Sequence, residues 1–343
     1  MKPLITVLID TFNHERYIEQ ALSSVLEQGL SAVEMEVVVV DDGSTDATAA
    51  IVQKFSPRVK LVTKKNGGQA SAFNAGFAAS AGEIIALLDG DDWWEKGKIA
   101  AVTEALEDNP DVAAVGHGYY EFHESTGRVD AHVPERREIL ELNTAAAARA
   151  AINHWRFLLM GALTVRRSVL DKIIPLPEEM IFMADTPIQA ASMTMRALVL
   201  EKPLFYYRRH AENLYAVETG NTDKLRRRYA MTELVYEMVY TKLLELGVSK
   251  QAASALVHGF CFNARRWRLG TYGGDRREVF RTEMDSFHEE FENASISYRL
   301  FKYLCVAPAT LSLPPKTFYR LRNWYAERQL GRHRERLVQR ENA

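Results

Sequence analysis

The first hundred residues alternate short, β-branched apolar runs with amphipathic segments, and this alternation limits the fold more than any other feature of the sequence. Four of the runs are predicted strands: Leu4–Ile9, Glu36–Val40, Val59–Thr63 and Glu83–Leu88. Between them the apolar residues have helical spacing, and Asn13 is predicted to cap a helix that begins near His14. Such alternation places parallel strands side by side with helices on both faces. The sequence therefore predicts an α/β fold with a Rossmann-like, mixed but mainly parallel sheet flanked by helices.

The pattern changes after Asp111. Val112–Phe122 and Arg128–Val133 are predicted to form an antiparallel excursion, and Leu198–Arg209 is predicted to be a returning strand. From Asp223 onward a 3.6-residue period predicts a helical C-terminal extension.

We therefore expect two regions along the chain. Residues 1–220 would form the α/β domain, with halves of about 1–110 and 111–220, and residues 221–343 would form the helical region.

The composition excludes several classes of protein. A net charge of −2 over 343 residues gives no reason to expect nucleic acid as a partner. Cys261 and Cys305 lie far apart without metal-ligand spacing, which favours a reducing compartment. Asp10 interrupts the N-terminal apolar run, and no run reaches the roughly 18 residues that a membrane-spanning helix needs. We expect a cytoplasmic protein, attached at most to the inner face of the cell membrane.

Three of the predicted strands end in carboxylates. These are Asp10 after the first strand, Asp41 and Asp42 after the second, and Asp89, Asp91 and Asp92 after the fourth. The carboxyl ends of parallel strands meet at the edge where open α/β sheets bind ligands. Acids gathered there repel one another, and a divalent cation with oxygen ligands relieves the repulsion. A solvated acidic loop, or acids that merely cap the following helices, are the alternative interpretations.

Glycines near the acids indicate which kind of ligand would bind together with the cation. Gly67 and Gly68 would let the backbone approach a diphosphate closely. The dinucleotide fingerprint G-x-G-x-x-G and the Walker pattern G-x-x-x-x-G-K-[ST] are absent from the sequence, which argues against the commonest dehydrogenases and NTPases. A metal-bound nucleoside diphosphate fits both the acids and the glycines.

Five longer segments occur in an order that matches one enzyme family. They are VLIDTFNHERYIEQALSSVLEQ (Val7–Gln28), VVVVDDGSTDAT (Val37–Thr48), NGGQASAFNAGFAASAGEIIALLDGDDWW (Asn66–Trp94), MADTPIQ (Met183–Gln189) and YYRRHAENL (Tyr206–Leu214). Together they resemble the family 2 glycosyltransferases, which have the nucleotide-sugar-binding GT-A fold. The resemblance covers about residues 3–215 and is specific because the segments occur together. It implies a GT-A-type catalytic domain whose first half binds the nucleotide sugar and whose second half binds the acceptor.

The resemblance implies a role for each matching position. The donor-binding residues would be Thr11, Phe12, Asp41, Asp42, Gly68, Asp89 and Gly90. Asp91 and His210 would hold a divalent cation, Mn²⁺ or Mg²⁺, and Asp185 would be the general base. The alternatives are that Asp185 only caps a helix and that His210 is a surface-loop residue.

Several positions near these residues depart from the family pattern or allow two roles. Asp10 stands in place of a proline, Phe73 in place of an arginine and Ala184 in place of a glutamate. Trp93 and Trp94 would either stack on a sugar or pack under the acidic loop.

The implied reaction is transfer of a sugar from a nucleoside-diphosphate donor, by family habit a UDP-sugar, to a carbohydrate or lipid-linked acceptor. The cation would stabilise the departing diphosphate, and a carboxylate would take the proton of the acceptor hydroxyl. Family members of this type invert the anomeric centre in one displacement, in the synthesis of cell-surface polysaccharide or glycolipid. The alternatives are a sugar nucleotidyltransferase, against which the sequence Asp10-Thr11-Phe12-Asn13 argues, and a non-catalytic nucleotide-sugar or membrane-binding scaffold.

The C-terminal tail concentrates positive charge. Residues 298–343 carry ten Lys or Arg against three Glu, a net charge near +7 in a chain of net charge −2. Aromatic and aliphatic residues interleave with the cations, which is typical of a segment that lies on an anionic membrane. Packing on the catalytic domain is the alternative. Residues 223–295 are predicted to provide a homo-oligomer interface.

Overall fold

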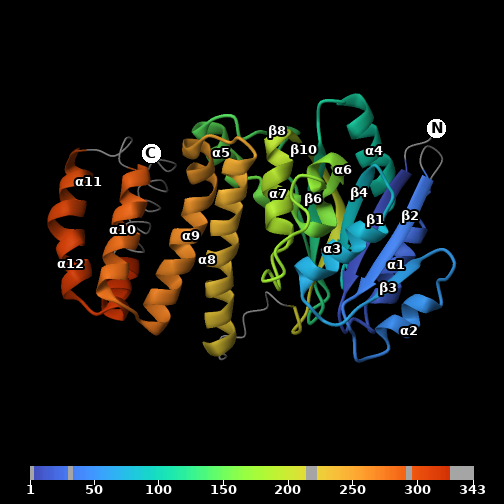
Figure 1. The fold of residues 1–343 in the computed structure, drawn as a ribbon, viewed down its shortest axis with the longest axis horizontal. Coiled ribbons are helices and arrows are strands. Elements are labelled where there is room, and N and C mark those ends of the chain that lie inside the picture. The colour runs from blue at the N-terminus through green and yellow to red at the C-terminus, as the bar shows by residue number, and fades with distance from the viewer. Residues whose placement is uncertain (1–3, 30–33, 214–221, 291–295, 325–343) are drawn as a thin grey trace, which may run out of the picture. The chain divides into compact units, whose positions relative to one another are not determined.

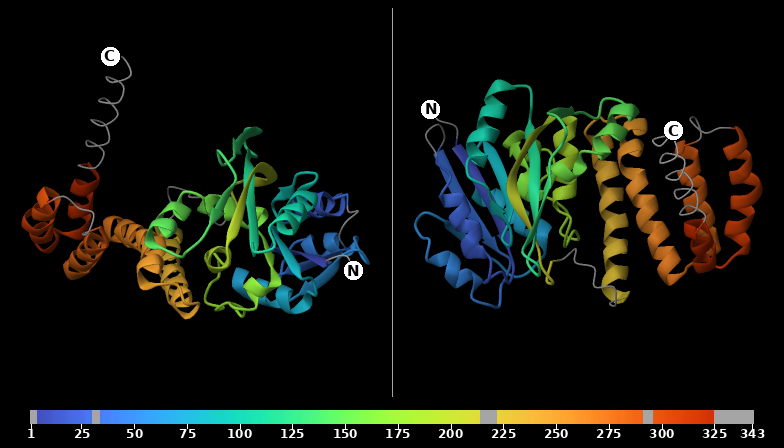
Figure 2. Two further views of the ribbon diagram at one scale, coloured as in Figure 1. Left: turned by 90° about the horizontal axis from the view of Figure 1, so that it is seen from above. Right: turned by 180° about the vertical axis from the view of Figure 1, so that it is seen from behind.

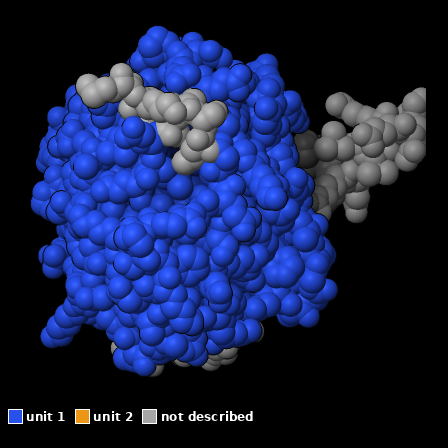
Figure 3. Space-filling view, turned by 90° about the vertical axis from the view of Figure 1, so that its right-hand side faces the viewer, with its two compact units in different colours: residues 1–218, 238–256 blue, residues 219–237, 257–343 orange. Residues whose placement is uncertain are grey.

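The computed structural model describes residues 4–29, 34–213, 222–290 and 296–324. Two compact units form within the chain: unit 1 comprises residues 1–218 and 238–256, and unit 2 comprises residues 219–237 and 257–343. Unit 1 contains the sheet, and one face of this unit is shown in Figure 3. The domain boundary near residue 220 stays a prediction.

Unit 1 is built around one ten-stranded sheet with the order β3-β2-β1-β4-β9-β6-β10-β5, in which β7 pairs with β6 and β8 with β10 (Figure 1). The strands are β1 Leu4–Thr11, β2 Glu34–Asp41, β3 Lys60–Thr63, β4 Ile84–Asp89, β5 Trp93–Trp94, β6 Ala114–His123, β7 Arg128–His132, β8 Glu138–Leu140, β9 Thr164–Arg166 and β10 Ala197–Arg209. β3, β2, β1 and β4 are mutually parallel, and β6 is parallel to β10. β9 is antiparallel to both β4 and β6 and so joins the two parallel parts. The predicted mixed, mainly parallel sheet is confirmed.

Helices pack on both faces of this sheet (Figure 2). Those that lie wholly in unit 1 are α1 Ile18–Leu26, α2 Thr48–Gln53, α3 Gln69–Ala79, α4 Lys98–Asp108, α5 Ala145–Ile152, α6 Arg167–Leu170 and α7 Asp185–Thr194, together with the 3-10 turns Trp155–Leu158 and Met160–Ala162. α3 packs on β1 and β2, and it does so closely because Gly76 faces the sheet. A Cβ at Gly76 would lie 2.2 Å from Leu8 Cδ1. The core strands themselves are fully buried aliphatic runs, as strands covered on both faces must be.

The loop before α1 differs from the prediction. α1 begins at Ile18 instead of near His14, and Asn13 does not cap it. Asn13 has a φ of 56°, and its Oδ1 accepts a hydrogen bond from the Thr45 backbone N–H at 2.8 Å. A contact between loops that are 32 residues apart thus displaced the local capping interaction.

The second half of unit 1 contains the predicted antiparallel excursion, since β6 and β7 pair through Tyr119–His123 and Arg128–His132. β10 returns parallel to β6, with two register shifts, one between Leu200 and Pro203 and one between Pro203 and Tyr206. These irregularities bend the strand before it reaches the acidic edge.

The C-terminal region is helical, as predicted. α8 Thr222–Glu245 and α9 Lys250–Tyr272 contribute to both units, whereas α10 Arg276–Glu290, α11 Ile296–Phe301, a π-helical turn Lys302–Val306 and α12 Ala307–Ser312 lie in unit 2. Unit 2 has its own small core of Leu269, Val279, Phe318 and Tyr319. None of the helices in the described ranges is long and apolar enough to cross a membrane.

Candidate active site

The acids predicted from the strand ends meet at one sheet edge. In the parallel register Asp10 of β1 lies opposite Asp89 of β4, and Thr11 lies opposite Asp41 of β2. The chain reverses direction after each of these strands, so the loops that follow also face this edge. The shared edge follows from the parallel pairing alone.

Asp91 is the centre of the best-connected polar group at this edge. Its Oδ2 accepts hydrogen bonds from His210 Nε2 at 3.0 Å and Asn213 Nδ2 at 3.1 Å. His14 Nε2 lies 3.9 Å from the same oxygen. Burial by itself would raise the pKa of Asp91, but the hydrogen bond from His210 and the electrostatic influence of the nearby His14 hold it below its usual value. His210 is thus a buried partner of Asp91 in the turn Asp89-Gly90-Asp91, a D-x-D motif, and its interpretation as a surface-loop residue is wrong.

Asp42 organises the glycine turn. Its carboxylate accepts from the backbone N–H groups of Gly67 and Gly68, the latter at 2.7 Å, and it pairs with Lys64 Nζ at 2.6 Å. Gly68 has a φ of 84°, and a Cβ there would lie 2.6 Å from Ile181 Cα. Only glycine therefore lets this turn pack against the segment that leads into α7.

Asp41 and Thr11 are also buried, while Phe12 is 41% exposed beside them. Asp41 Oδ1 accepts hydrogen bonds from the N–H and hydroxyl of Ser44. Ala47 stands at the N-cap of α2, so the interpretation of the Asp41-Asp42 pair as caps for this helix is wrong.

At Gly90 the backbone lies so close to the loop after β1 that a side chain would not fit. A Cβ at Gly90 would lie 2.5 Å from Thr11 Oγ1, and Thr11 in turn contacts His14 Nδ1 at 3.2 Å. The absence of a side chain at Gly90 brings the loop after β1 against the D-x-D turn. Contact of Thr11, Phe12, Asp41, Asp42, Gly68, Asp89 and Gly90 with a donor stays a prediction.

The remaining acids are crowded. Burial and the neighbouring Asp91 raise the pKa of Asp10 to about 7, and burial together with Asp10 raises the pKa of Asp89 well above its usual value. Asp92 shows the same upward shift in pKa, with burial first and Asp91 second among the causes. Asp10 Oδ1 is a buried oxygen without a hydrogen-bond partner in the described part of the chain. A cation bound at this edge would therefore favour the ionised form of these acids.

Asp185 lies near this cluster but in a different environment. It is the first residue of α7, and Ala184 occupies the N-cap position, so the interpretation of Asp185 as an N-cap is wrong. Burial raises the pKa of Asp185 to about 6, although the backbone N–H of Thr186 and the side chain of Gln189 partly counteract the shift. Its charge in turn raises the pKa values of Asp10 and Asp89. A carboxyl group with a pKa near neutrality can accept a proton from a substrate.

Gln69 joins the acid cluster to Asp185 and was not foreseen from the sequence. Its Oε1 accepts from the Ala184 backbone N–H at 3.0 Å, and its Nε2 lies 3.4 Å from Asp89 Oδ1. Its own backbone N–H donates to the Ile181 carbonyl at 3.1 Å. Gln69 is therefore the direct link between the D-x-D turn and the start of α7.

Arg208 is the second unforeseen residue. Its backbone N–H donates to Asp92 Oδ1 at 2.8 Å, and its Nε donates to the Asp91 carbonyl at 2.8 Å. The guanidinium lies over the ring of Trp93, 4.5 Å from its centroid. Trp93 also stacks on Tyr206 at 4.6 Å, whereas Trp94 is buried, with Lys98 Nζ 4.0 Å from the centroid of its ring.

The donor set suits a hard divalent cation. Carboxylate oxygens are ligands that both Mn²⁺ and Mg²⁺ prefer, and Mn²⁺ also accepts an imidazole. The Asp10 oxygen that has no partner among the described residues and the raised pKa of Asp89 show where positive charge would be stabilising. In the described ranges no three His, Cys, Asp or Glu side chains form a group that could hold an ion by themselves. Mg²⁺-type sites are commonly completed by substrate phosphates, so one or two protein ligands suffice.

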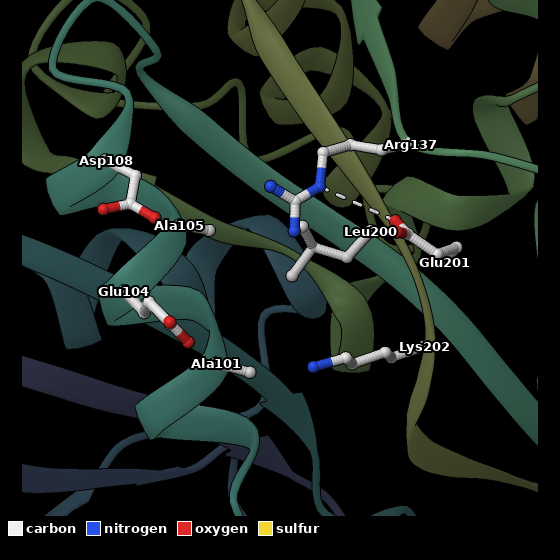
Figure 4. Close-up of a pocket in the computed structure, with 8 residues that line it drawn as sticks. All are labelled: Ala101, Glu104, Ala105, Asp108, Arg137, Leu200, Glu201 and Lys202. Atoms are coloured by element: carbon white, nitrogen blue, oxygen red, sulfur yellow. Dashed lines mark ion pairs between the residues drawn. The ribbon is translucent and has the colours of Figure 1, made fainter.

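A small cavity lies elsewhere in unit 1. It has a volume of about 120 Å³ and is lined by residues of α4 and β10, with Arg137 pairing with Glu201 at 3.6 Å (Figure 4). None of the predicted site residues lines this cavity.

Comparison with known sequences places these features in one family. The family model described as Glycosyl transferase family 2 matches residues 6–174. The uncharacterized glycosyltransferase alr2836 of Nostoc sp. is 31% identical over 250 residues, which are 71% of this chain and 76% of that protein. The putative teichuronic acid biosynthesis glycosyltransferase TuaG of Bacillus subtilis is 39% identical over 109 residues, 31% of this chain and 42% of TuaG.

Solved structures of other proteins have a similar fold. S. aureus TarS 1–349 in complex with UDP has a TM-score of 0.66 at 19% identity, over 95% of this chain and 92% of that one. The mannosyltransferase PcManGT of Pyrobaculum calidifontis, in complex with GDP-Man and Mn²⁺, has a TM-score of 0.50 at 19% identity, over 95% of this chain and 88% of that one. At this level of identity the likeness shows the fold alone. The matched family model and the similarity to alr2836 along 76% of its length show that this chain belongs to glycosyl transferase family 2.

Proposed function

We propose that this glycosyltransferase moves a sugar from a UDP-sugar to an acceptor hydroxyl, with inversion, in the synthesis of a cell-surface polysaccharide or glycolipid. One observation carries the proposal: Asp185, whose pKa is raised to about 6, lies beside a cluster of strand-end acids and is tied to it through Gln69. Such a transfer requires a proton acceptor next to a group of carboxylates that can bind a cation.

On the donor side, Asp91 with His210 would hold a divalent cation, and Asp89 would contact the cation or the ribose. When bound, the cation would act as a Lewis acid that stabilises charge on the departing diphosphate. His210 and Asn213 fix the orientation of the Asp91 carboxylate through their hydrogen bonds to Oδ2. Asp42 and Lys64 hold the Gly67–Gly68 turn in place for the donor.

On the acceptor side, Asp185 would take the proton of the attacking hydroxyl. Its pKa of about 6 leaves it mostly ionised at neutral pH, yet high enough to accept a proton in the transition state. Attack from the side opposite to the diphosphate would invert the anomeric carbon, and Asp185 would be the base for this single displacement.

The donor and the acceptor class are supported by the relatives. TarS was crystallised with UDP, and TuaG is named for teichuronic acid biosynthesis. Uridine as the base and a surface glycan or its lipid-linked precursor as the acceptor are therefore our proposal for this chain.

The proposal is tested by a donor screen on the full chain. Release of the nucleoside diphosphate from nucleotide sugars by hydrolysis, in which water accepts the sugar, would be followed with Mn²⁺, with Mg²⁺ and with a chelator. We expect release from a UDP-sugar with a divalent cation and none with the chelator; failure with every donor would refute the proposal.

An Asp185→Asn variant separates the enzyme from a non-catalytic scaffold. We expect it to bind UDP as the wild type does but to lose transfer by about a hundredfold or more. Asp171→Asn, at an exposed position just after α6, is the matched control and should keep full activity. Equal transfer by the Asp185 and Asp171 variants would remove Asp185 from the mechanism.

A further inference from the structure

The helical run over residues 296–312 turns an apolar stripe toward solvent. The run consists of α11, the π-helical turn and α12 (Figure 1). Ile296, Leu300, Leu304 and Leu311 are 77%, 54%, 71% and 47% exposed. Their spacing of four, four and seven residues places them on one side of the helix, which we call the outward face.

The opposite side of the same helix holds a buried charge. Lys302 is 7% exposed, and its Nζ lies 3.6 Å from Glu283, which is completely buried. Glu283 also pairs with Arg266 at 2.8 Å and Arg322 at 3.5 Å. Burial alone would raise the pKa of Glu283, but Arg266, followed by Arg322 and Lys302, lowers it.

On this helix the apolar stripe therefore faces solvent and a charged side chain faces the core, which is the reverse of an ordinary surface helix. Val306, Ala309 and Leu313 pack against the core of unit 2, and Lys302 is fixed by its ion pair. Rotating the helix to bury the leucines would break this pair and leave Glu283 short of a partner, which is costly for a buried charge. The exposed leucines follow from the structure of unit 2, and such a patch on a soluble surface indicates an interaction site.

The charge of residues 296–324 indicates the kind of partner. Residues 296–324 contain five Lys or Arg and no Asp or Glu. Lys302 and Arg322 lie against Glu283, whereas Lys316 and Arg320 are exposed. Tyr303 and Trp324, which are 47% and 50% exposed, add side chains that favour the boundary between water and lipid.

We propose that the outward face docks this enzyme on an anionic lipid surface. Leu300, Leu304 and Leu311 enter the boundary between head groups and acyl chains, and Lys316 and Arg320 contact the anionic head groups. A symmetric contact with a second copy fits less well, because it would bring these cations near their counterparts without an acid in residues 296–324 to offset them. The inference goes beyond the proposed sugar transfer and does not depend on it.

Co-sedimentation of the full chain with vesicles tests the docking. Vesicles of phosphatidylcholine alone are compared with vesicles that also contain phosphatidylglycerol. We expect binding to the anionic vesicles, and we expect Leu300→Asp/Leu304→Asp to weaken it by about tenfold or more, since two inserted side chains become charged. Lys316→Glu/Arg320→Glu should also reduce binding to the anionic vesicles, and added salt should weaken wild-type binding.

Leu234→Asp/Leu244→Asp is the matched control. Both leucines are on α8 and are 38% and 39% exposed, so the variant carries the same chemical change away from the outward face. It should bind vesicles as the wild type does. Circular dichroism establishes that each variant is folded, and release of UDP from a soluble donor reports on the active site separately.

Three results would overturn the inference. They are absence of wild-type binding to anionic vesicles, unchanged binding of the Leu300/Leu304 variant, and a wild-type oligomer that this variant converts to monomers without any vesicle binding. The last result, read by analytical ultracentrifugation, would identify the outward face as a contact between copies of this chain.

Discussion

Replacing Gly68 by alanine should disable the enzyme without removing any charged group. Gly68 has φ 84° and ψ 175°, a conformation that is essentially restricted to glycine and costs other residues about 1–3 kcal/mol. The added Cβ would also lie 2.6 Å from Ile181 Cα and 3.0 Å from the Ile181 carbonyl oxygen. Both of these atoms belong to the backbone, so they cannot move away as a flexible side chain would.

The clash should reach Asp185 through the segment before α7. Ile181 accepts a hydrogen bond from the Gln69 N–H, and Asp185 follows four residues later. A displacement of the base by a fraction of an ångström to one ångström is enough to slow a positioned reaction by about a hundredfold. We therefore expect Gly68→Ala to lower both the free energy of unfolding and kcat, with a smaller change in KM for the donor.

Gly127→Ala supplies the control for this prediction. Gly127 also has a positive φ of 69°, but no atom lies within 4 Å of its added Cβ. Denaturant unfolding and release of UDP are measured for both variants. The reasoning is refuted if Gly68→Ala keeps the activity of Gly127→Ala.

Three further predictions concern the groups around the acid cluster. Because Asp185 must be ionised to accept a proton and has a pKa of about 6, kcat/KM at saturating Mn²⁺ should fall by about tenfold per pH unit below pH 6; a flat profile from pH 7 to pH 5 would contradict this. His210→Gln, which removes the 3.0 Å contact to Asp91, should raise the Mn²⁺ concentration needed for half-maximal activity by about 10–100-fold, and an unchanged Mn²⁺ titration would count against the metal assignment. Gln69→Ala leaves the Ala184 N–H without its partner and should cost about 1–3 kcal/mol in unfolding free energy together with a loss in kcat; the exposed Gln53→Ala is its control, and equal behaviour of the two would exclude the linking role.

Features that depend on local pattern were predictable from the sequence. The buried runs before Asp10, Asp41 and Asp89 predict strands, and parallel pairing then brings their ends to one edge whatever the details of packing. The family resemblance added Asp185 and His210, whose roles no local pattern could indicate.

Features that depend on distant partners were not predictable. Gln69 contacts Asp89 and Ala184, which are 20 and 115 positions away in the sequence, and the residues next to Gln69 predict neither contact. Asn13 was expected to cap a helix because its local sequence suits a cap, but Thr45, 32 residues later, binds its side chain instead. The spacing of the apolar residues in 296–312 likewise predicts an apolar stripe on a helix, but it does not tell which side of the helix faces the core. The ion pair of Lys302 with the buried Glu283 turns the side that carries Lys302 toward the core.

The two register shifts in β10 have a consequence for how this enzyme can diverge. They separate an inner stretch, Ala197–Leu200, from an outer stretch, Tyr206–Arg209, that delivers Arg208 and, just beyond it, His210 to the acids. Side chains two apart share a side of a strand, so these two residues move together. A single-residue insertion or deletion in the outer stretch would therefore turn both side chains away from Asp91, whose carbonyl accepts from Arg208 Nε and whose carboxylate accepts from His210. A two-residue change would keep their side but move them about 7 Å along the strand, so divergence in this enzyme has to leave the length of the outer stretch unchanged.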